Sequence, residues 1–167
     1  MTLAPTGTAR VRDKRMNPFH ALTTALRKCF PSHSAGSATQ MRVCNRTRST
    51  VLATQLEVAG TGGTRRKGLL GREGLAPGEG LWIIPCEAVH TFFMRFHIDL
   101  VYLDGKNCVR KVRSAVGPWR LSACFSARSI LELPSGTIRA TRTERGDTLE
   151  ISPAASSPCN PQDPTTC

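Results

Sequence analysis

The sequence predicts an α+β domain in which a compact, largely antiparallel and barrel-like β-sheet carries two short helices. Three observations lead to this prediction. Six or seven short apolar or alternating segments are bounded by glycine, proline or Asp-Gly, as strands usually are. Only two stretches join a capping residue to a short helical pattern. Most connections between these segments are short, which favours pairing of neighbouring strands.

The length of 167 residues suits one domain with tails, and 40% hydrophobic with 21% charged residues is a globular composition. We place this single domain at residues 41–151. Residues 1–40 hold six basic side chains and one acidic one, and residues 152–167 hold four prolines, so both ends are predicted to be disordered. Two other readings of the basic end stay open. In the first, residues 1–40 are an upstream stretch that is not translated, since strand-like sequence directly follows Met41. In the second, they are an organellar transit peptide.

The first elements of the domain are a strand and a helix. Thr50–Ala59 alternates between apolar and polar residues and is followed by a glycine, which is typical of a strand. A short helix comes next, capped by Thr61 or Thr64 and running to Leu70. Gly71 then supplies the left-handed residue that ends the helix.

The densest apolar run of the chain, Val89–Asp104, supplies the centre of the predicted sheet. A buried strand at residues 81–84 precedes it. Within the run, Val89–Met94 and Ile98–Leu103 are predicted as two strands separated by a polar kink. An Asp-Gly turn then leads into Cys108–Val116, the return strand of a hairpin.

The last elements are shorter. Residues 123–129 are weakly patterned, and Ile130–Leu133 is a short strand that Pro134 terminates. A short helix is predicted near residues 138–142, capped by a hydroxyl side chain. Leu149–Ile151 is the final strand.

The same region carries a series of short motifs: Arg66-x-Gly68-Leu69-Leu70, Gly80-Leu81-Trp82-Ile83, His90-Thr91-Phe92-Phe93-Met94-Arg95, Ile98–Asp104, Leu131–Gly136 and Gly146-Asp147. In order and spacing these motifs resemble the domain of unknown function 192 family, over nearly all of residues 51–151. The resemblance implies a compact, sheet-rich α+β fold and brings no established activity with it. The chain departs from the family at His97, where members typically carry a proline.

The number and spacing of the cysteines indicate which cellular compartment, disulfides and zinc sites to expect. There are seven of them, an odd number without any Cys-x-x-Cys pair, which predicts neither a disulfide framework nor a zinc site. Free thiols are best tolerated in a reducing compartment, so a cytoplasmic location is expected. No stretch is long and apolar enough for a membrane span. We therefore expect no membrane span, no metal and no cofactor.

The preferred prediction for function is a non-enzymatic binding or accessory module. Polar side chains gather at the mouth of apolar strands that do not need them for stability. They are predicted to line a pocket for an unknown small ligand or protein partner, and they are His90, Thr91, Arg95, His97, Asp99 and Glu132. A structural reading competes with this one. In it the histidines are ordinary rim or core residues, Asp99 accepts backbone amides, and Arg95 forms an ion pair with Glu132.

An enzyme of unknown type is an alternative prediction, and it would use Cys86, His90 and Asp99. The cysteine and His90 lie four residues apart across an irregular segment, so a thiol beside an imidazole is geometrically open. With His97, the same residues are also conceivable metal ligands. Their spacing, however, matches no standard zinc pattern.

Nucleic-acid binding is the other alternative. The formal net charge is +11, and two cationic clusters stand out: Arg65, Arg66 and Lys67, and Arg110, Lys111 and Arg113. Such clusters neutralise phosphates and make affinity depend on salt. Against this reading, only 5% of residues are aromatic and most of these lie in apolar runs. Solvated faces of a helix and a strand explain the charges as well.

Overall fold

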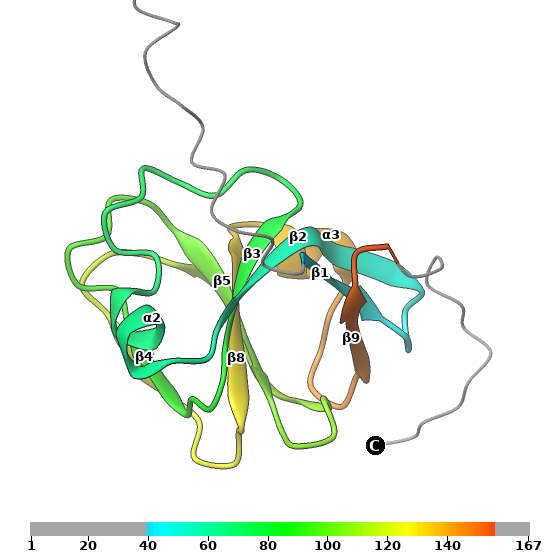
Figure 1. The fold of residues 1–167 in the computed structure, drawn as a ribbon. Helices are drawn as coiled ribbons and strands as arrows, with labels where there is room; N and C mark the ends of the chain where they lie inside the picture. Colours follow the sequence, from blue (N-terminus) through cyan, green and yellow to red (C-terminus); the bar gives the residue numbers. More distant parts are fainter. Residues whose placement is uncertain (1–39, 156–167) are drawn as a thin grey trace, which may run out of the picture. The chain divides into compact units, whose positions relative to one another are not determined.

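The computed structural model describes residues 40–155, so most of the two predicted tails, residues 1–39 and 156–167, lies outside the described part of the chain. Within residues 40–155 the chain forms a seven-stranded sheet, a two-stranded sheet and two short helices. The large sheet is curled and mostly antiparallel (Figure 1). This confirms the prediction of an α+β domain with a barrel-like sheet.

The large sheet has the strand order β6-β5-β8-β3-β2-β1-β9. Its members are β1 (Met41–Asn45), β2 (Thr50–Ala59), β3 (Glu79–Ile83), β5 (Ile98–Leu103), β6 (Val109–Val116), β8 (Ser129–Pro134) and β9 (Leu149–Pro153). The β2–β3 pair is parallel and the other pairs are antiparallel. A parallel pair needs a long crossover, and the segment containing the first short helix supplies it. β2 and β5 begin and end at their predicted residues, whereas β9 runs two residues beyond the predicted end of the domain.

The predicted strand over Val89–Met94 was wrong, because the chain turns after His90. β4 is only Ala88–His90, and it pairs with β7 (Leu121–Ala123) in the two-stranded sheet. Thr91 causes the turn: its carbonyl accepts the amides of both Met94 and Trp119. The apolar run was read as a strand because its length and composition suit one, but its aromatic part lies on a turn. β7 was missed because it is three residues long.

The two helices are short. α2 (Gly62–Lys67) begins at Thr61, which exchanges hydrogen bonds with Thr64 in a capping box. It ends at Gly68 rather than at the predicted Gly71, because Gly68 has φ 48° and ψ −129°, a conformation that glycine adopts readily. The second helix, α3 (Thr137–Thr141), follows β8 and has Ile138 as its buried apolar residue.

The central strands β8 and β5 are apolar on both sides and therefore build two cores, one on each face of the large sheet. Successive strand residues point to opposite faces. On one face, Leu100 and Ile130 belong to a core that Leu69, which follows α2, also joins. On the other face, Val101 and Leu131 pack with residues of β1, β2 and α3. We call these the α2 face and the α3 face.

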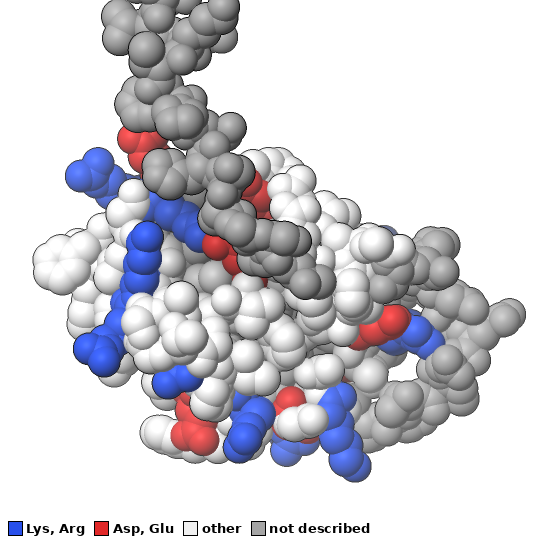
Figure 2. Space-filling model, in the orientation of Figure 1, with Lys and Arg blue, Asp and Glu red and all other residues white. Residues whose placement is uncertain are grey.

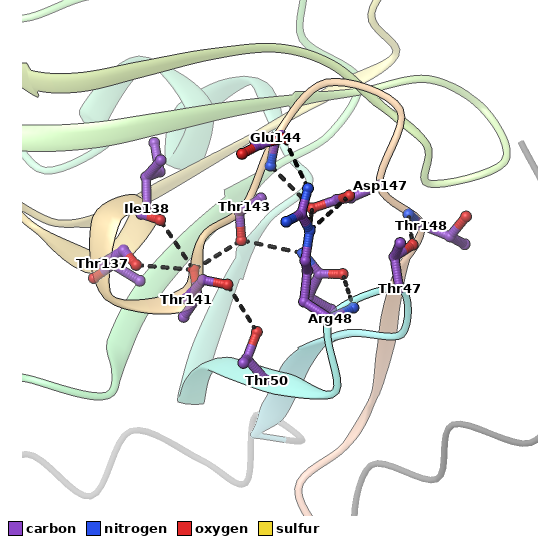
Figure 3. Close-up of polar contacts among 11 residues, drawn as sticks. Thr47, Arg48, Thr50, Thr137, Ile138, Thr141, Thr143, Glu144, Asp147 and Thr148 are labelled. Atoms are coloured by element: carbon purple, nitrogen blue, oxygen red, sulfur yellow. Dashed lines mark hydrogen bonds and ion pairs between the residues drawn. The ribbon is translucent and has the colours of Figure 1, made fainter.

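A network of hydrogen bonds and ion pairs between polar residues lies near α3 (Figure 3). The buried Asp147 carboxylate accepts from the Asn45 amide at 2.7 Å and pairs with Arg48 at 3.2 Å, and Arg48 also pairs with Glu144 at 2.8 Å. The backbone amide of Glu144 donates to the same carboxylate. Because these contacts satisfy its carboxylate within the fold, we interpret Asp147 of the Gly-Asp motif as a structural residue.

The cysteines differ from the expectation drawn from their spacing. Cys44 and Cys108 each take part in a disulfide, whereas Cys86 and Cys124 carry free thiols. The spacing of the cysteines in the sequence did not indicate these disulfides. Among the described residues, no helix has the length and apolar character needed to cross a membrane.

Candidate functional site

Glu132 is a charged residue on the apolar α2 face of β8. It lies opposite Leu81 of β3 and Leu100 of β5, both of which belong to the core on this face. Its exposed fraction is 3%. The Leu-Glu-Leu alternation of β8 puts the two leucines into the α3-face core, so the same alternation directs the carboxyl to the opposite side.

The Glu132 carboxyl makes no hydrogen bond or ion pair with any residue in 40–155, and its Oε2 atom is buried without a partner. Burial raises its pKa from 4.5 to about 7, against the opposite and weaker effect of the Arg72 charge. Arg72 is already engaged, because its guanidinium binds both oxygens of Glu57, at 2.9 and 2.7 Å. A buried carboxyl without a partner destabilises a fold, so stability does not explain its presence.

A pocket of about 350 Å³ opens above this carboxyl. It lies between α2, the end of β3 and β4. The apolar part of its wall is made by buried side chains of the core: Leu69, Ile83, Val89 and Met94. Its size is in the range of small-molecule sites, and an apolar wall with few polar groups is the usual character of such sites.

The basic residues of α2, Arg65, Arg66 and Lys67, also line the pocket. Figure 2 shows Lys and Arg side chains gathered on the part of this face where α2 lies in Figure 1. The Arg65 guanidinium donates to the Gly60 carbonyl at 2.8 Å. The side chains of Arg66 and Lys67 form no hydrogen bond or ion pair with the rest of the described chain. The pocket therefore has an acidic floor and a basic rim.

Gly68 joins the rim to the floor. A Cβ atom placed on Gly68 would lie 3.9 Å from Glu132 Oε2, so the end of α2 passes directly over the carboxyl. The positive φ of this residue also disfavours any side chain there. The sequence motif Arg-x-Gly-Leu-Leu contains both the cation and the glycine, but the pattern alone did not connect them with Glu132.

Cys86 and His90 complete the polar lining of the pocket. The Cys86 thiol donates to the Ala88 carbonyl at 3.1 Å, and burial raises its pKa above the usual 9.0. It is therefore a thiol at neutral pH and not the thiolate that nucleophilic catalysis requires. The His90 ring is stacked on Phe92, with 5.0 Å between ring centroids.

Asp99 and Thr91, two of the predicted rim residues, are buried in the fold. The Asp99 carboxylate lies on the α3 face and accepts the backbone amides of Ala115, Gly136 and Ile138 at 2.8, 3.1 and 2.8 Å. The Thr91 hydroxyl donates to the Gly117 carbonyl at 2.8 Å and accepts the amide of Arg120 at 2.9 Å. Neither residue lines the pocket.

Arg95 and His97 also lie outside this pocket. Arg95 is exposed and lines a separate hollow with Phe93 and Arg72. His97 is exposed, and its ring lies against Gly117. The structure thus brings together Glu132 and His90 from the predicted rim and separates the other four residues from them.

The proposed catalytic set of Cys86, His90 and Asp99 is not assembled. The first two line the pocket on the α2 face, whereas Asp99 is on the α3 face and is engaged by three amides. Over residues 40–155 no group of three or more His, Cys, Asp or Glu side chains is placed to hold a metal ion.

The two cationic clusters that were predicted to bind nucleic acid differ in whether the fold already engages their side chains. The α2 cations line the pocket, as described above. In the β6 cluster, Lys111 donates to the Ala123 carbonyl at 2.8 Å and lies over the Tyr102 ring. Arg110 lies 3.8 Å from the carboxylate of Asp104. Two of the three β6 cations are thus already engaged by the fold.

An exposed aromatic group, which we call the aromatic ledge, lies beside His90 and consists of Phe92, Phe93 and Trp119. Phe93 and Trp119 are 72% and 56% exposed, with ring centroids 4.7 Å apart. Both residues have positive φ, 65° and 59°, which is uncommon for bulky side chains. Sequence reasoning assigned Phe92 and Phe93 to a strand.

The comparisons with known proteins agree with this fold. The model of the DUF192 family, described as Uncharacterized ACR, matches residues 43–151. A UPF0127 protein of Thermococcus kodakarensis is 33% identical over 79 residues, which cover 44% of this chain and 50% of that protein. A UPF0127 protein of Thermococcus sibiricus is 30% identical over 115 residues, which cover 64% of this chain and 71% of the relative. The chain therefore spans only half the length of the first of these relatives.

Two crystal structures share the fold at low sequence identity. One is a Sinorhizobium meliloti protein named as a candidate transcription regulator, with a TM-score of 0.58, 20% identity and coverage of 67% of this chain and 92% of that one. The other is a Novosphingobium aromaticivorans protein of unknown function, with a TM-score of 0.59, 19% identity and coverage of 66% and 83%. On the strength of the family match across its folded core, this chain belongs to the uncharacterised DUF192 family.

Proposed function

We propose that this chain is a non-enzymatic binding module whose ligand is a small molecule held in the pocket above Glu132. One observation carries the proposal: a carboxyl that is 3% exposed, without a partner among residues 40–155 and on an apolar sheet face, lines an open pocket. Groups whose ionisation is strongly perturbed by burial in a concave site are typical of functional sites.

Binding suits the pocket better than catalysis does. Its two other reactive groups are the neutral Cys86 thiol, which is hydrogen-bonded to a carbonyl, and His90, whose ring is stacked on Phe92. Nucleophilic catalysis needs a nucleophile, a base and a group that orients the base. The carboxylate predicted for this last role, Asp99, lies on the other face of the sheet.

A pocket-blocking variant tests the proposal. We expect a small-fragment library, screened by amide NMR on the full chain, to yield compounds that shift the amides of Gly68, Cys86 and His90. Ala88 is exposed and lines the pocket, so Ala88→Trp should cover its mouth and abolish these shifts. Ala140→Trp, at an exposed position on α3, is the matched control and should bind as the wild type does. Fragments that bind Ala88→Trp unchanged, or that shift only other regions, would reject the pocket.

The aromatic ledge supports a second candidate function, the binding of single-stranded nucleic acid. Exposed aromatic rings stack on bases regardless of sequence, and nearby arginines neutralise phosphates. Arg95 and Arg120 are exposed and lie within two residues of Phe93 and Trp119 along the chain. Both exposed rings belong to residues with positive φ, and such sparsely populated backbone conformations cluster at functional sites.

Removing the larger ring tests this candidate. Trp119→Ala should weaken binding of a short oligothymidine by about tenfold, because one stacked base contributes about 1–3 kcal/mol. Fluorescence anisotropy at two salt concentrations measures the affinity and its salt dependence. Val58→Ala, at an exposed apolar position on β2, is the control. Equal affinity of Trp119→Ala and wild type would exclude the ledge as a nucleic-acid site.

A further inference from the structure

We propose that the ligand of the pocket is a small zwitterion, in which an ammonium group binds the Glu132 carboxyl and an acidic group binds the cations of α2. The inference rests on the proposed binding function and adds the class of ligand. Its basis is the arrangement of charge in the pocket, which has an acidic floor on β8, a basic rim on α2 and buried apolar side chains in its wall.

Glu132, the floor of the pocket, has no positive partner within the described residues. Among residues 40–155 no cation forms an ion pair with Glu132, and Arg72, whose charge acts on it, is committed to Glu57. A buried carboxylate is tolerated only when its charge is paired and hydrogen-bonded. An ammonium group has one positive charge and several N–H donors, so it meets both needs at once.

The cations of the rim have no negative partner in the part of the chain that the structure describes. α2 has three consecutive cations in its last turn and no acidic residue in its first. Arg66 and Lys67 form no ion pair with the described residues, and Arg65 binds an uncharged carbonyl. Three positive charges on one short helix create a local positive potential, which would attract an acidic group of a ligand.

The charges of the pocket disfavour ligands that carry only one charged group. A ligand with only an acidic group would satisfy the rim and bring a second negative charge towards the floor. A ligand with only an amine would suit the floor but must pass three cations. The wall of the pocket includes Leu69, Ile83 and Met94, so the uncharged part of the ligand is expected to be hydrocarbon. The other titratable groups at the pocket are the neutral Cys86 thiol and His90 at the rim.

Matched compounds separate these classes. Leucine, 4-methylpentanoate and 3-methylbutylamine share one hydrocarbon skeleton and differ only in which charged groups they carry. We expect leucine to bind the full-length chain at least about tenfold more tightly than either analogue, as measured by calorimetry and by shifts of the Gly68 amide. O-phosphoethanolamine, compared with ethyl phosphate and ethylamine, repeats the comparison with a phosphate as the acidic group.

Two variants assign the contacts. Glu132→Gln should remove the advantage of leucine over 4-methylpentanoate, whereas Glu87→Gln, at an exposed position, should keep it. Arg65→Gln combined with Arg66→Gln should remove the advantage over 3-methylbutylamine, and the exposed pair Arg139→Gln with Arg145→Gln is the control. The wild-type comparison decides the matter even where a variant does not fold.

Two results would overturn the zwitterion. One is equal binding of leucine and 4-methylpentanoate in the pocket, and the other is the absence of Gly68 shifts with every compound of both sets. Neither result rejects the binding module itself. That proposal fails separately, when the library screen finds no compound whose binding Ala88→Trp abolishes.

Discussion

Replacing Glu132 with glutamine is expected to remove a loss of stability that the wild-type protein suffers as the pH rises. The pKa of this carboxyl is 4.5 in the unfolded reference and is raised to about 7 by burial in the folded chain. Between these pH values the folded state keeps a proton that the unfolded state has released. Stability contributed by the protonated carboxyl is therefore lost as the pH rises from about 4.5 to about 7, by about 3 kcal/mol.

Urea unfolding at pH 4.5 and at pH 7.5 measures the free energy of unfolding of the wild type and of the variant. The difference between the two proteins isolates the effect of Glu132, because the titration of all other groups cancels. Glutamine keeps the shape of the side chain and does not ionise. The variant should therefore be more stable than the wild type at the higher pH, and the gap should narrow at the lower pH. Glu87→Gln serves as the control and should follow the wild type at both pH values, because Glu87 is exposed. A gap that does not change with pH would mean that Glu132 ionises normally in the fold.

Replacing Asp99 with alanine is expected to destabilise the protein by about 3–5 kcal/mol, enough to unfold most of a domain of ordinary stability. The completely buried Asp99 carboxylate accepts the amides of Ala115, Gly136 and Ile138, two of which lie at the start of α3. Alanine leaves all three donors without a partner inside the fold, and each orphaned donor costs about 1–3 kcal/mol.

Asp99→Asn separates the structural role from a role in binding. Asparagine retains one acceptor oxygen, so this variant should lose less stability than Asp99→Ala and should fold at low temperature. Its urea midpoint should fall while its pocket binds the screened fragments with unchanged affinity. Glu73→Ala, at an exposed loop position, is the control for stability. If Asp99→Ala kept the stability of the wild type, the carboxylate would be available for a ligand and the account given for it would be wrong.

The strands were largely predictable because their signal is local. Alternation and the bounding glycines and prolines placed β2 and β5 at their observed ends, since a sheet with two cores requires apolar residues along its central strands. The turn at Thr91 was not predictable in the same way. Its hydrogen bonds reach Trp119 and Arg120, almost thirty residues away along the chain, and no local pattern announces them.

The site was predictable only in part. Asp99 and Glu132 are both acidic residues between apolar neighbours, so the sequence alone does not distinguish a structural role from a role in binding. They differ because Asp99 meets the free amides beside α3, whereas Glu132 faces the α2 side, where no donor within the described part of the chain reaches it. The contribution of Arg65, Arg66 and Lys67 to the same pocket depends on the crossover between β2 and β3, which local patterns do not place.

The pKa of Glu132 tests the central claim most directly, because that claim is that an unpaired carboxyl forms the floor of an open pocket. Carbon-detected NMR of the side-chain carboxyl in the full-length chain, titrated from acid to alkaline pH, measures this value. The account predicts a midpoint near 7. A midpoint at or below the ordinary 4.5 would show that water or a cation of the protein already stabilises the Glu132 carboxylate, and it would contradict both the binding pocket and the zwitterion.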